Sequence, residues 1–326
     1  MKTLKMICNA VLALCLAACG IDQKPVNLDH SVKTIPASYA DDAEEQGTVV
    51  RLNYQAHLYD TDEMIEKHCY VYLPYGYDEH PQQKYDILYF MHGGGSTAEK
   101  FLGGTDSISL NRKTLDHMIQ DGLIKPMIVV TPSFYRNDFR EDSLPNAGDL
   151  VKMFPRELTE ELMPAVESQF RTYASSTSPG DLMAARDHRA FSGFSMGSVT
   201  TWWVFNKALD YFRYFIPLSG DCWYVQSMGG SRASEATADA LAEVARGCKY
   251  GELGFFIFTM TGTEDMASNQ LTPQVEAMKA LPEFKVDDDF RKGNFYFSVL
   301  EGGKHESSIF GPHYIYTALP EFFPAE

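Results

Sequence analysis

The sequence is short of basic residues and of long apolar runs, and each shortage excludes a class of protein. Only 28 Lys and Arg stand against 44 Asp and Glu, which gives a formal net charge of −16. Because no basic cluster could neutralise phosphate groups, nucleic acid is not an expected partner. Apart from one run near the N-terminus, no stretch approaches the roughly 20 apolar residues that span a membrane as a helix.

Cysteine is also scarce, with six in the whole chain. Three of these lie within or directly after the N-terminal apolar run, which leaves Cys69, Cys222 and Cys248 in the body of the sequence. Three cysteines allow at most one internal disulfide; a Cys222–Cys248 pair is one option, and the sequence does not decide it. No Cys/His spacing is typical of a zinc site, so we expect neither a metal nor a cofactor.

The first residues have the pattern of an export signal. Lys2 and Lys5 precede an apolar run over residues 6–18, which is too short to cross a membrane. The run ends in Leu-Ala-Ala-Cys-Gly and resembles a bacterial lipobox, which implies that Cys19 becomes the lipidated first residue. Cleavage of a plain signal peptide near Ala18 is the alternative. We expect an exported lipoprotein of the cell envelope, periplasmic or at the cell surface, that touches the membrane through its lipid anchor only.

The rest of the chain divides into a linker and one large domain. Residues 19–47 are polar with an acidic run, as in a tether, and residues 48–326 form the expected domain. Two strand-like segments open the domain, and short apolar strands then alternate with helical patterns. This order predicts an α/β fold, a mostly parallel central sheet with helices on both faces. The expected strands lie near 49–54, 68–73, 86–91, 127–131, 190–193, 214–218, 255–261 and 295–300, and the expected helices near 113–122, 155–169, 196–208, 235–246, 272–280 and 313–322.

A Gly-x-Ser-x-Gly motif with Ser195 at its centre joins one of these strands to a helix. Because Gly193 and Gly197 lack Cβ atoms, the strand and the helix can pass close together. The serine is expected to adopt a strained conformation that projects its hydroxyl above the sheet, where the Met196 N–H can face an oxyanion. This pattern is the nucleophile elbow of α/β-hydrolases, so it predicts that fold and makes Ser195 the candidate nucleophile.

A glycine-rich loop, His92-Gly93-Gly94-Gly95, directly follows the strand predicted over 86–91. In lipases and esterases such a loop supplies a second oxyanion N–H, because backbone rather than side chain must approach the substrate. Gly94 or Gly95 is the candidate donor, and the sequence does not choose between them. We expect His92 to orient the loop through hydrogen bonds.

Two later loops hold candidates for the other members of a catalytic triad. Asp265 follows the strand over 255–261, with Glu264 as the alternative acid, and His305 follows the last predicted strand. The chain order of serine, acid and histidine is that of α/β-hydrolases. In this interpretation His305 takes the proton of Ser195, and Asp265 fixes the tautomer of the histidine.

Together these segments resemble the esterase D-like proteins of carbohydrate esterase family 1, a group that includes feruloyl and acetylxylan esterases. The resemblance covers roughly residues 48–326 and implies a serine esterase that acts on feruloylated xylan and its oligosaccharides, with the triad and oxyanion loop named above. An acetylxylan esterase on the same scaffold, with acetylated xylan as its partner, is one alternative. A non-catalytic carbohydrate-binding lipoprotein is an alternative from another class.

Two aromatic pairs are the candidate substrate contacts: Phe134 with Tyr135, and Trp223 with Tyr224. Each pair follows a predicted parallel strand, and ligands bind at the carboxyl ends of such strands. Flat rings suit a hydroxycinnamoyl ring or the face of a sugar, although packing within the loops is an equal alternative. The long segment over 134–153 is expected to lie over the site as a lid.

Overall fold

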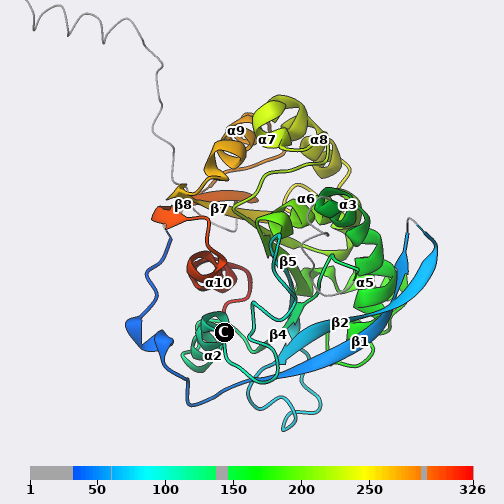
Figure 1. Ribbon diagram of the computed structural model, residues 1–326, viewed down its shortest axis with the longest axis vertical. Helices are drawn as coiled ribbons and strands as arrows, with labels where there is room; N and C mark the ends of the chain where they lie inside the picture. The colour runs from blue at the N-terminus through cyan, green and yellow to red at the C-terminus, as the bar shows by residue number, and fades with distance from the viewer. Residues whose placement is uncertain (1–31, 60, 137–145, 288–291, 326) are drawn as a thin grey trace, which may run out of the picture.

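The structure, a computed structural model, describes residues 32–59, 61–136, 146–287 and 292–325 (Figure 1). The predicted signal segment and Cys19 lie outside the described residues. Within the described ranges, no helix combines the length and the apolar character that crossing a bilayer requires.

The centre of the domain is a sheet of eight strands among the described residues, in the order β1-β2-β4-β3-β5-β6-β7-β8. β2 is antiparallel to both of its neighbours, and all other neighbouring strands are parallel. The predicted α/β-hydrolase fold, with its mostly parallel sheet, is therefore confirmed. The strands are β1 (Thr48–Leu58), β2 (Glu63–Leu73), β3 (Asp86–Met91), β4 (Met127–Thr131), β5 (Arg189–Phe194), β6 (Tyr214–Leu218), β7 (Phe256–Glu264) and β8 (Phe295–Lys304).

Helices cover both faces of the sheet, with α2 and α10 on one side and α3 and α6 on the other (Figure 1). Alternate residues of each strand enter separate cores: Tyr89 and Met91 of β3 pack with Trp202 of α6, whereas Leu88 and Phe90 pack with Tyr314 of α10. The helices are α2 (Leu110–Gln120), α3 (Ala147–Glu157), α4 (Met163–Glu167), α5 (Pro179–Ala184), α6 (Met196–Ala208), α7 (Gly229–Arg232), α8 (Ser234–Arg246), α9 (Ser268–Lys279) and α10 (Ser307–Phe322), and the short turns are η1 (Ala37–Ala40), η3 (Leu158–Leu162), η4 (Arg186–His188) and η5 (Leu209–Tyr211).

The helix predicted over 155–169 differs most from the structure. The helical pattern in the sequence predicts a start near residue 155. Pro155 instead lies inside α3, which begins at Ala147, and the π-helical turn η3 follows before α4. The chain stays helical through residues 147–167, because Leu158 and Met163 at the two junctions keep helical backbone angles, and Pro155 only removes one N–H from the hydrogen-bond ladder.

The tether predicted over 19–47 also differs in its described part, because residues 32–47 lie on the domain. Tyr39 of η1 is 3% exposed and its hydroxyl donates to Asp121 at 2.6 Å. At the other end of this segment, the Gly47 N–H donates to Asp116 Oδ1 at 2.8 Å. Any free tether is therefore confined to residues before about 32, where the structure gives no description.

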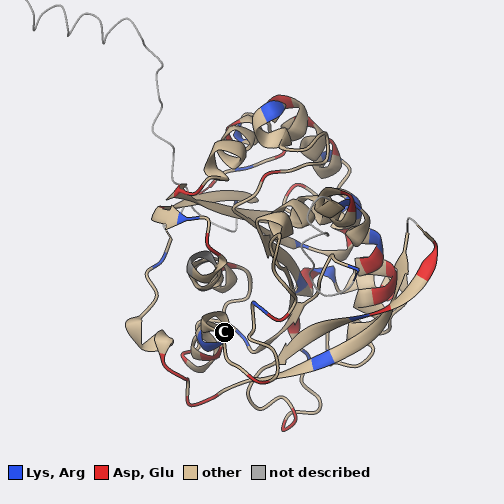
Figure 2. Ribbon diagram, viewed as in Figure 1, with Lys and Arg blue, Asp and Glu red and all other residues tan. Residues whose placement is uncertain are grey.

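Charged residues are distributed rather than gathered. On the face drawn in Figure 2, Lys and Arg of the described residues are scattered among more numerous Asp and Glu. This distribution offers no broad positive surface to a polyanion on that face.

Candidate active site

The turn between β5 and α6 has the backbone geometry of a nucleophile elbow. Ser195 has φ 57° and ψ −115°, a left-handed conformation that costs energy for a residue with a side chain. The turn also needs its glycines: a Cβ on Gly197 would lie 2.1 Å from the Met91 carbonyl oxygen, and one on Gly193 would lie 2.5 Å from the carbonyl carbon of Gly197. The close approach of β3, β5 and α6 therefore fixes where the Ser195 hydroxyl stands.

The structure brings together the three residues predicted as the triad. His305 Nε2 lies 2.9 Å from Ser195 Oγ, and His305 Nδ1 lies 2.8 Å from Asp265 Oδ1. The Asp265 side chain is fully buried, whereas that of His305 is 18% exposed. A second donor, the Ala267 N–H, holds the same Asp265 oxygen at 2.7 Å. This geometry allows the imidazole to accept the serine proton while the carboxylate orients it.

Strand pairing explains why Asp265 and His305 meet. The predicted strands end at residues 261 and 300, but β7 and β8 continue to Glu264 and Lys304, which pair with each other beyond an irregularity in the ladder. Asp265 and His305 directly follow these paired strand ends, so the two residues lie side by side. Glu264, the alternative acid, is exposed, and its Oε2 lies 3.9 Å from Lys304 Nζ.

Two backbone N–H groups are available near Ser195. Met196 is the first residue of α6, so its N–H has no acceptor within the helix. On the opposite side, the loop after β3 approaches so closely that a Cβ on Gly93 would lie 3.3 Å from the Ser195 Cβ. The Gly95 N–H is already engaged, because it donates to the Tyr135 hydroxyl at 3.0 Å. Gly94 is therefore the better candidate for the second oxyanion donor.

His92 sets the orientation of this loop. Its Nδ1 lies 2.8 Å from the Gly93 carbonyl oxygen, and its Nε2 lies 2.8 Å from Ser133 Oγ. Ser133 Oγ accepts the Tyr135 N–H at 3.1 Å, so its own proton can go to Nε2 and Nδ1–H then donates to Gly93. The Gly93 carbonyl and the Gly94 N–H belong to one planar trans peptide unit, so holding the carbonyl also aims the N–H.

Burial keeps the His92 imidazole neutral. The residue is 4% exposed, and this desolvation lowers its pKa from 6.5 to about 4. The positive charge of Lys67 acts in the same direction. A neutral ring is what the hydrogen bonds require, because a protonated Nε2 could not accept the Ser133 hydroxyl proton.

The aromatic pair Phe134 and Tyr135 does not lie where a substrate ring would contact it. The two residues are only 3% and 1% exposed, and their ring centroids lie 4.8 and 5.4 Å from that of His92. Their burial corrects the expectation of two stacking surfaces in this loop: both rings pack under the oxyanion loop. The sequence pattern located the loop correctly but carried no information on which way its side chains turn.

The second aromatic pair lines a pocket beside the elbow. The pocket has a volume of about 580 Å³ and includes Met196, Trp223 and Tyr224, all of them half-buried. Trp223 is held by its indole N–H, which donates to the buried Asp221 at 2.9 Å. The Tyr224 hydroxyl accepts from Lys207 at 3.2 Å.

The first turns of α3 also line this pocket, through Gly148, Asp149 and Lys152. Part of the predicted lid, residues 137–145, lies outside the described residues, but the described part of the segment thus borders the pocket. Asp149 and Lys152 were not among the predicted contacts, and no local motif distinguishes them from other surface charges of a helix.

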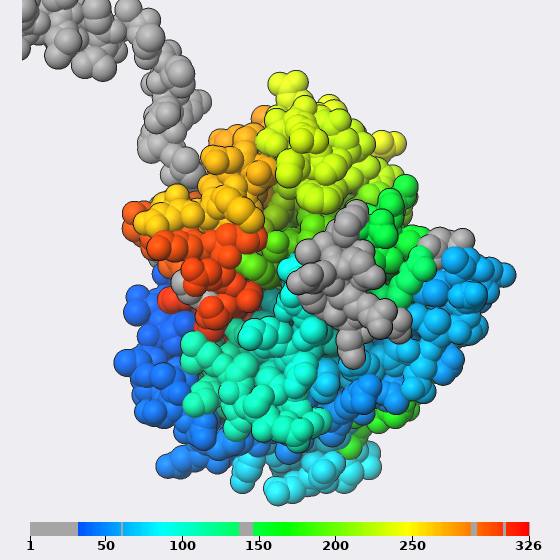
Figure 3. Space-filling view, viewed as in Figure 1, coloured from blue at the N-terminus to red at the C-terminus, as the bar shows by residue number. Residues whose placement is uncertain are grey.

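On the face in Figure 3, the orange-red atoms near residues 300–308 lie beside the turquoise atoms of the segment after β3.

Metal-ligating groups and cysteine thiols are the other reactive groups to consider in the described ranges. No group of three or more His, Cys, Asp or Glu gathers there as a metal site would need. Cys69, Cys222 and Cys248 are all free thiols, so the optional Cys222–Cys248 disulfide does not form. Burial raises the pKa of Cys222 to about 12, which keeps this thiol protonated and unreactive.

Comparison with known proteins agrees with this geometry. Residues 65–315 match the family described as "Putative esterase". The chain belongs to this esterase family. It is 41% identical over 289 residues to endo-1,4-beta-xylanase Y of Acetivibrio thermocellus, a match that covers 88% of this chain and 24% of that protein. It is also 31% identical over 168 residues to an endo-1,4-beta-xylanase/feruloyl esterase of Xylanibacter ruminicola, covering 50% of this chain and 21% of that protein.

Solved structures of esterases are also similar to this chain. A serine-to-alanine variant of the feruloyl esterase module from Clostridium thermocellum, complexed with sinapinate, is 39% identical with a TM-score of 0.76. The match covers 91% of this chain and 95% of the module. A ferulic acid esterase from Anaeromyces mucronatus, 20% identical with a TM-score of 0.60 over 90% of this chain and 98% of its own, shares the fold.

These matches confirm the resemblance to carbohydrate esterase family 1 that the motifs indicated. The chain spans about a quarter of the length of the curated relatives, so it corresponds to one module of those proteins.

Proposed function

We propose that this chain is a serine esterase that hydrolyses feruloyl esters of xylan. The observation that carries the proposal is the imidazole of His305, which lies 2.9 Å from Ser195 Oγ and 2.8 Å from Asp265 Oδ1 beside an aromatic pocket. The feruloyl esterase module with which the chain shares 39% identity supports the same activity.

The proposed reaction begins with attack of Ser195 Oγ on the ester carbonyl carbon. His305 Nε2 accepts the hydroxyl proton, and the Asp265 carboxylate stabilises the imidazolium that forms. In this mechanism the N–H groups of Met196 and Gly94 donate hydrogen bonds to the carbonyl oxygen as negative charge develops on it. The imidazolium then returns the proton to the leaving alcohol, and water releases the acid from the acyl-serine by the same steps.

The pocket beside Met196 supports an aromatic acyl group over acetyl. Its volume of about 580 Å³ is far larger than one methyl group fills, and Trp223 offers a half-buried ring held in place by Asp221. A feruloyl ring stacked there would remove apolar surface of both partners from water, whereas acetyl cannot reach it. An acetylxylan esterase remains the second candidate, because the family resemblance includes that group.

The test is a panel of methyl ferulate, acetylated xylan and p-nitrophenyl acetate, with Ser195→Ala as the matched blank. We expect kcat/KM for methyl ferulate to exceed that for the acetyl esters, and release of ferulate from feruloylated xylan oligosaccharides. Preferential release of acetate from acetylated xylan would overturn the feruloyl assignment. A wild-type protein without activity on any ester would overturn the esterase assignment as well.

We further propose that the chain is exported and anchored as a lipoprotein through Cys19, on the ground of the Leu-Ala-Ala-Cys-Gly sequence that ends the apolar run. Expression of the full chain with radioactive palmitate should label the wild-type protein and leave Cys19→Ser unlabelled. Equal labelling of both, or none in the wild type, would contradict the anchor and leave the esterase proposal untouched.

A further inference from the structure

A buried ion pair lies beneath the oxyanion loop, outside the residues that the reaction uses. Lys67 of β2 contacts Glu157 at the end of α3, with Nζ 2.7 Å from Oε1 and 2.9 Å from Oε2. The two side chains are only 4% and 10% exposed. A buried ion pair contributes little net stability compared with two well-packed apolar side chains, so its presence here calls for another role.

A further hydrogen bond of the Lys67 ammonium leads toward the active site. Nζ donates to the Ser133 carbonyl oxygen at 2.9 Å, and the hydroxyl of the same serine lies 2.8 Å from His92 Nε2. One continuous set of contacts therefore runs from Lys67 through Ser133 and His92 to the carbonyl of Gly93. The far end of that peptide unit is the N–H of Gly94, the candidate oxyanion donor.

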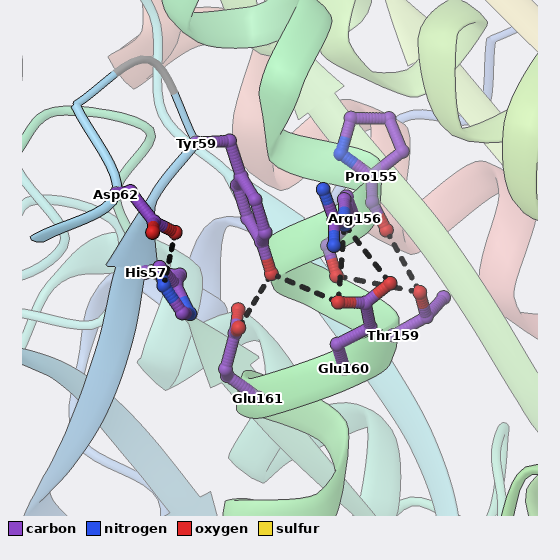
Figure 4. Close-up of polar contacts among 8 residues, drawn as sticks. All are labelled: His57, Tyr59, Asp62, Pro155, Arg156, Thr159, Glu160 and Glu161. Carbon is purple, nitrogen blue, oxygen red and sulfur yellow. Dashed lines mark hydrogen bonds and ion pairs between the residues drawn. The ribbon is translucent and has the colours of Figure 1, made fainter. Parts of the chain in front are cut away.

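Glu157 is itself fixed from two sides. The buried Tyr54 hydroxyl donates to its Oε1 at 2.7 Å. Directly after Glu157, the π-helical turn η3 meets the end of the β1–β2 hairpin, where the Tyr59 hydroxyl donates to Glu161 at 2.5 Å (Figure 4). The Arg156 guanidinium also lies 4.2 Å from the centroid of the Tyr59 ring. Glu157 is thus held in one place and supports the Lys67 ammonium from a fixed position.

We propose that Lys67 is a positioning residue for the ester hydrolysis: paired with Glu157, it holds Ser133 and thereby His92 and the Gly93–Gly94 peptide in the orientation that the oxyanion needs. The inference rests on the proposed function. Preorganised donors are effective because they need not reorganise when charge develops, and this set of buried contacts supplies that rigidity. Two titratable residues lie near His92: Tyr135, whose ring stacks on it, and Lys67, whose charge acts on it.

The test variant is Lys67→Met combined with Glu157→Leu. Replacing Lys67 alone would leave a buried carboxylate unpaired and could unfold the domain, whereas removing both charges avoids that penalty. We expect kcat on p-nitrophenyl acetate to fall by roughly ten- to a hundredfold with KM within about twofold, less than the 10²- to 10³-fold cost of deleting an oxyanion donor. An unchanged kcat in the folded double variant would overturn the proposal.

A matched control is a second buried pair, Arg189 with Glu167, whose Nε and Oε1 lie 2.6 Å apart with both side chains 0% exposed. Arg189 begins β5, at the opposite end of the strand from the elbow. Arg189→Met with Glu167→Gln should keep kcat within about twofold at a temperature where it stays folded. If both double variants lost kcat equally, the effect of replacing Lys67 would be general destabilisation, and the proposal would be overturned.

Two further variants act on the link itself. Ser133→Ala removes the hydroxyl that contacts His92 but leaves the carbonyl that Lys67 holds, and it should lower kcat in the same direction. Ser133→Thr keeps a hydroxyl and should restore most of the loss. If Ser133→Ala kept the wild-type kcat, the link through His92 would be wrong.

A readout independent of activity separates this inference from the proposed function. Hydrogen exchange of the peptide covering residues 92–96 should accelerate in the Lys67→Met, Glu157→Leu variant and not in the Arg189 control, because the Gly95 N–H donates to the Tyr135 hydroxyl and the Ser96 N–H to the Gly93 carbonyl. A wild type without activity on any ester would refute the proposed function, and loop exchange would still decide whether Lys67 positions the loop. Unchanged exchange would contradict positioning even in an active enzyme.

Discussion

The two sides of Ser195 are built differently. On the side of the glycine loop, His92, Tyr135 and Lys67 are at most 6% exposed and are joined by hydrogen bonds. On the side of the pocket, Trp223 is half-buried, and Val225 beside it is 46% exposed. The three side chains on the first side are closed to solvent, and the cavity that His92 and Gly93 border has only about 210 Å³, whereas Trp223 and Val225 line the cavity of about 580 Å³.

This difference matches two physical demands on an esterase. Stabilising a transition state requires donors that are fixed before the reaction, and a buried polar network fixes them. Recognising an acyl group requires apolar surface that the ligand, rather than the protein, will cover. We therefore expect changes on the loop side to lower turnover on every ester, and changes on the pocket side to alter the choice among esters.

The largest effect should come from Ser195→Ala, because this residue stands between the two sides and serves both. We expect hydrolysis of methyl ferulate and of p-nitrophenyl acetate to fall together by about a millionfold, as removal of a triad serine does elsewhere. Thermal unfolding should show little change in stability. Retention of near-native activity on either ester would exclude Ser195 as the nucleophile.

Asp265→Asn should come next and should also affect both esters equally. An amide can donate to His305 Nδ1 and so favours the wrong tautomer, which lowers kcat by about 10⁴-fold in a serine triad. The matched control is Glu264→Gln, at an exposed neighbour, and it should have a small effect. Steady-state kinetics of the two variants decide the acid, and the opposite ranking would transfer the role to Glu264.

On the pocket side, Trp223→Ala should discriminate between esters. Loss of a stacked ring costs about 1 kcal/mol beyond the lost buried area, so kcat/KM for methyl ferulate should fall by at least about tenfold. Activity on p-nitrophenyl acetate should change far less. Trp223→Phe is the control that keeps a ring, and it should retain most of the feruloyl activity. Equal losses on the two esters would assign Trp223 to packing alone.

The smallest effect concerns stability on the loop side. The pKa of His92 is lowered from 6.5 to about 4 by burial, so between these values the unfolded chain binds a proton that the folded chain does not. Stability therefore falls as the pH is lowered through this window, by up to about 3 kcal/mol from this group. Urea unfolding at pH 7 and pH 4 should show a correspondingly smaller fall for His92→Gln. An identical fall in both proteins would contradict a buried neutral imidazole.

Much of the site was predictable because its elements have local signatures. The elbow depends on two glycines and a serine in five residues, and helix α6 has the bounds 196–208 that its pattern predicts. The strands β3, β4 and β6 likewise match their predicted ranges, since continuous apolar runs between turn residues mark buried parallel strands. The loops that carry Asp265 and His305 could be located by counting strands.

What could not be predicted depends on contacts between distant residues. Lys67 and Glu157 are separated by 90 positions, and neither lies in a motif that announces a buried pair. The rings of Phe134 and Trp223 follow strands in similar contexts, yet the first packs on His92 and the second lines a pocket. Periodicity indicates where a strand ends, whereas the direction of a loop side chain is set by tertiary packing.

The most direct test of the central claim, that loop and pocket divide the work, is one ratio measured in three proteins. The ratio is kcat/KM for methyl ferulate over kcat/KM for p-nitrophenyl acetate, in the wild type, in Trp223→Ala and in Lys67→Met with Glu157→Leu. The account predicts a ratio about tenfold lower in Trp223→Ala and unchanged in the double variant, although the latter is slower on both esters. A ratio that falls in the double variant and not in Trp223→Ala would contradict the account.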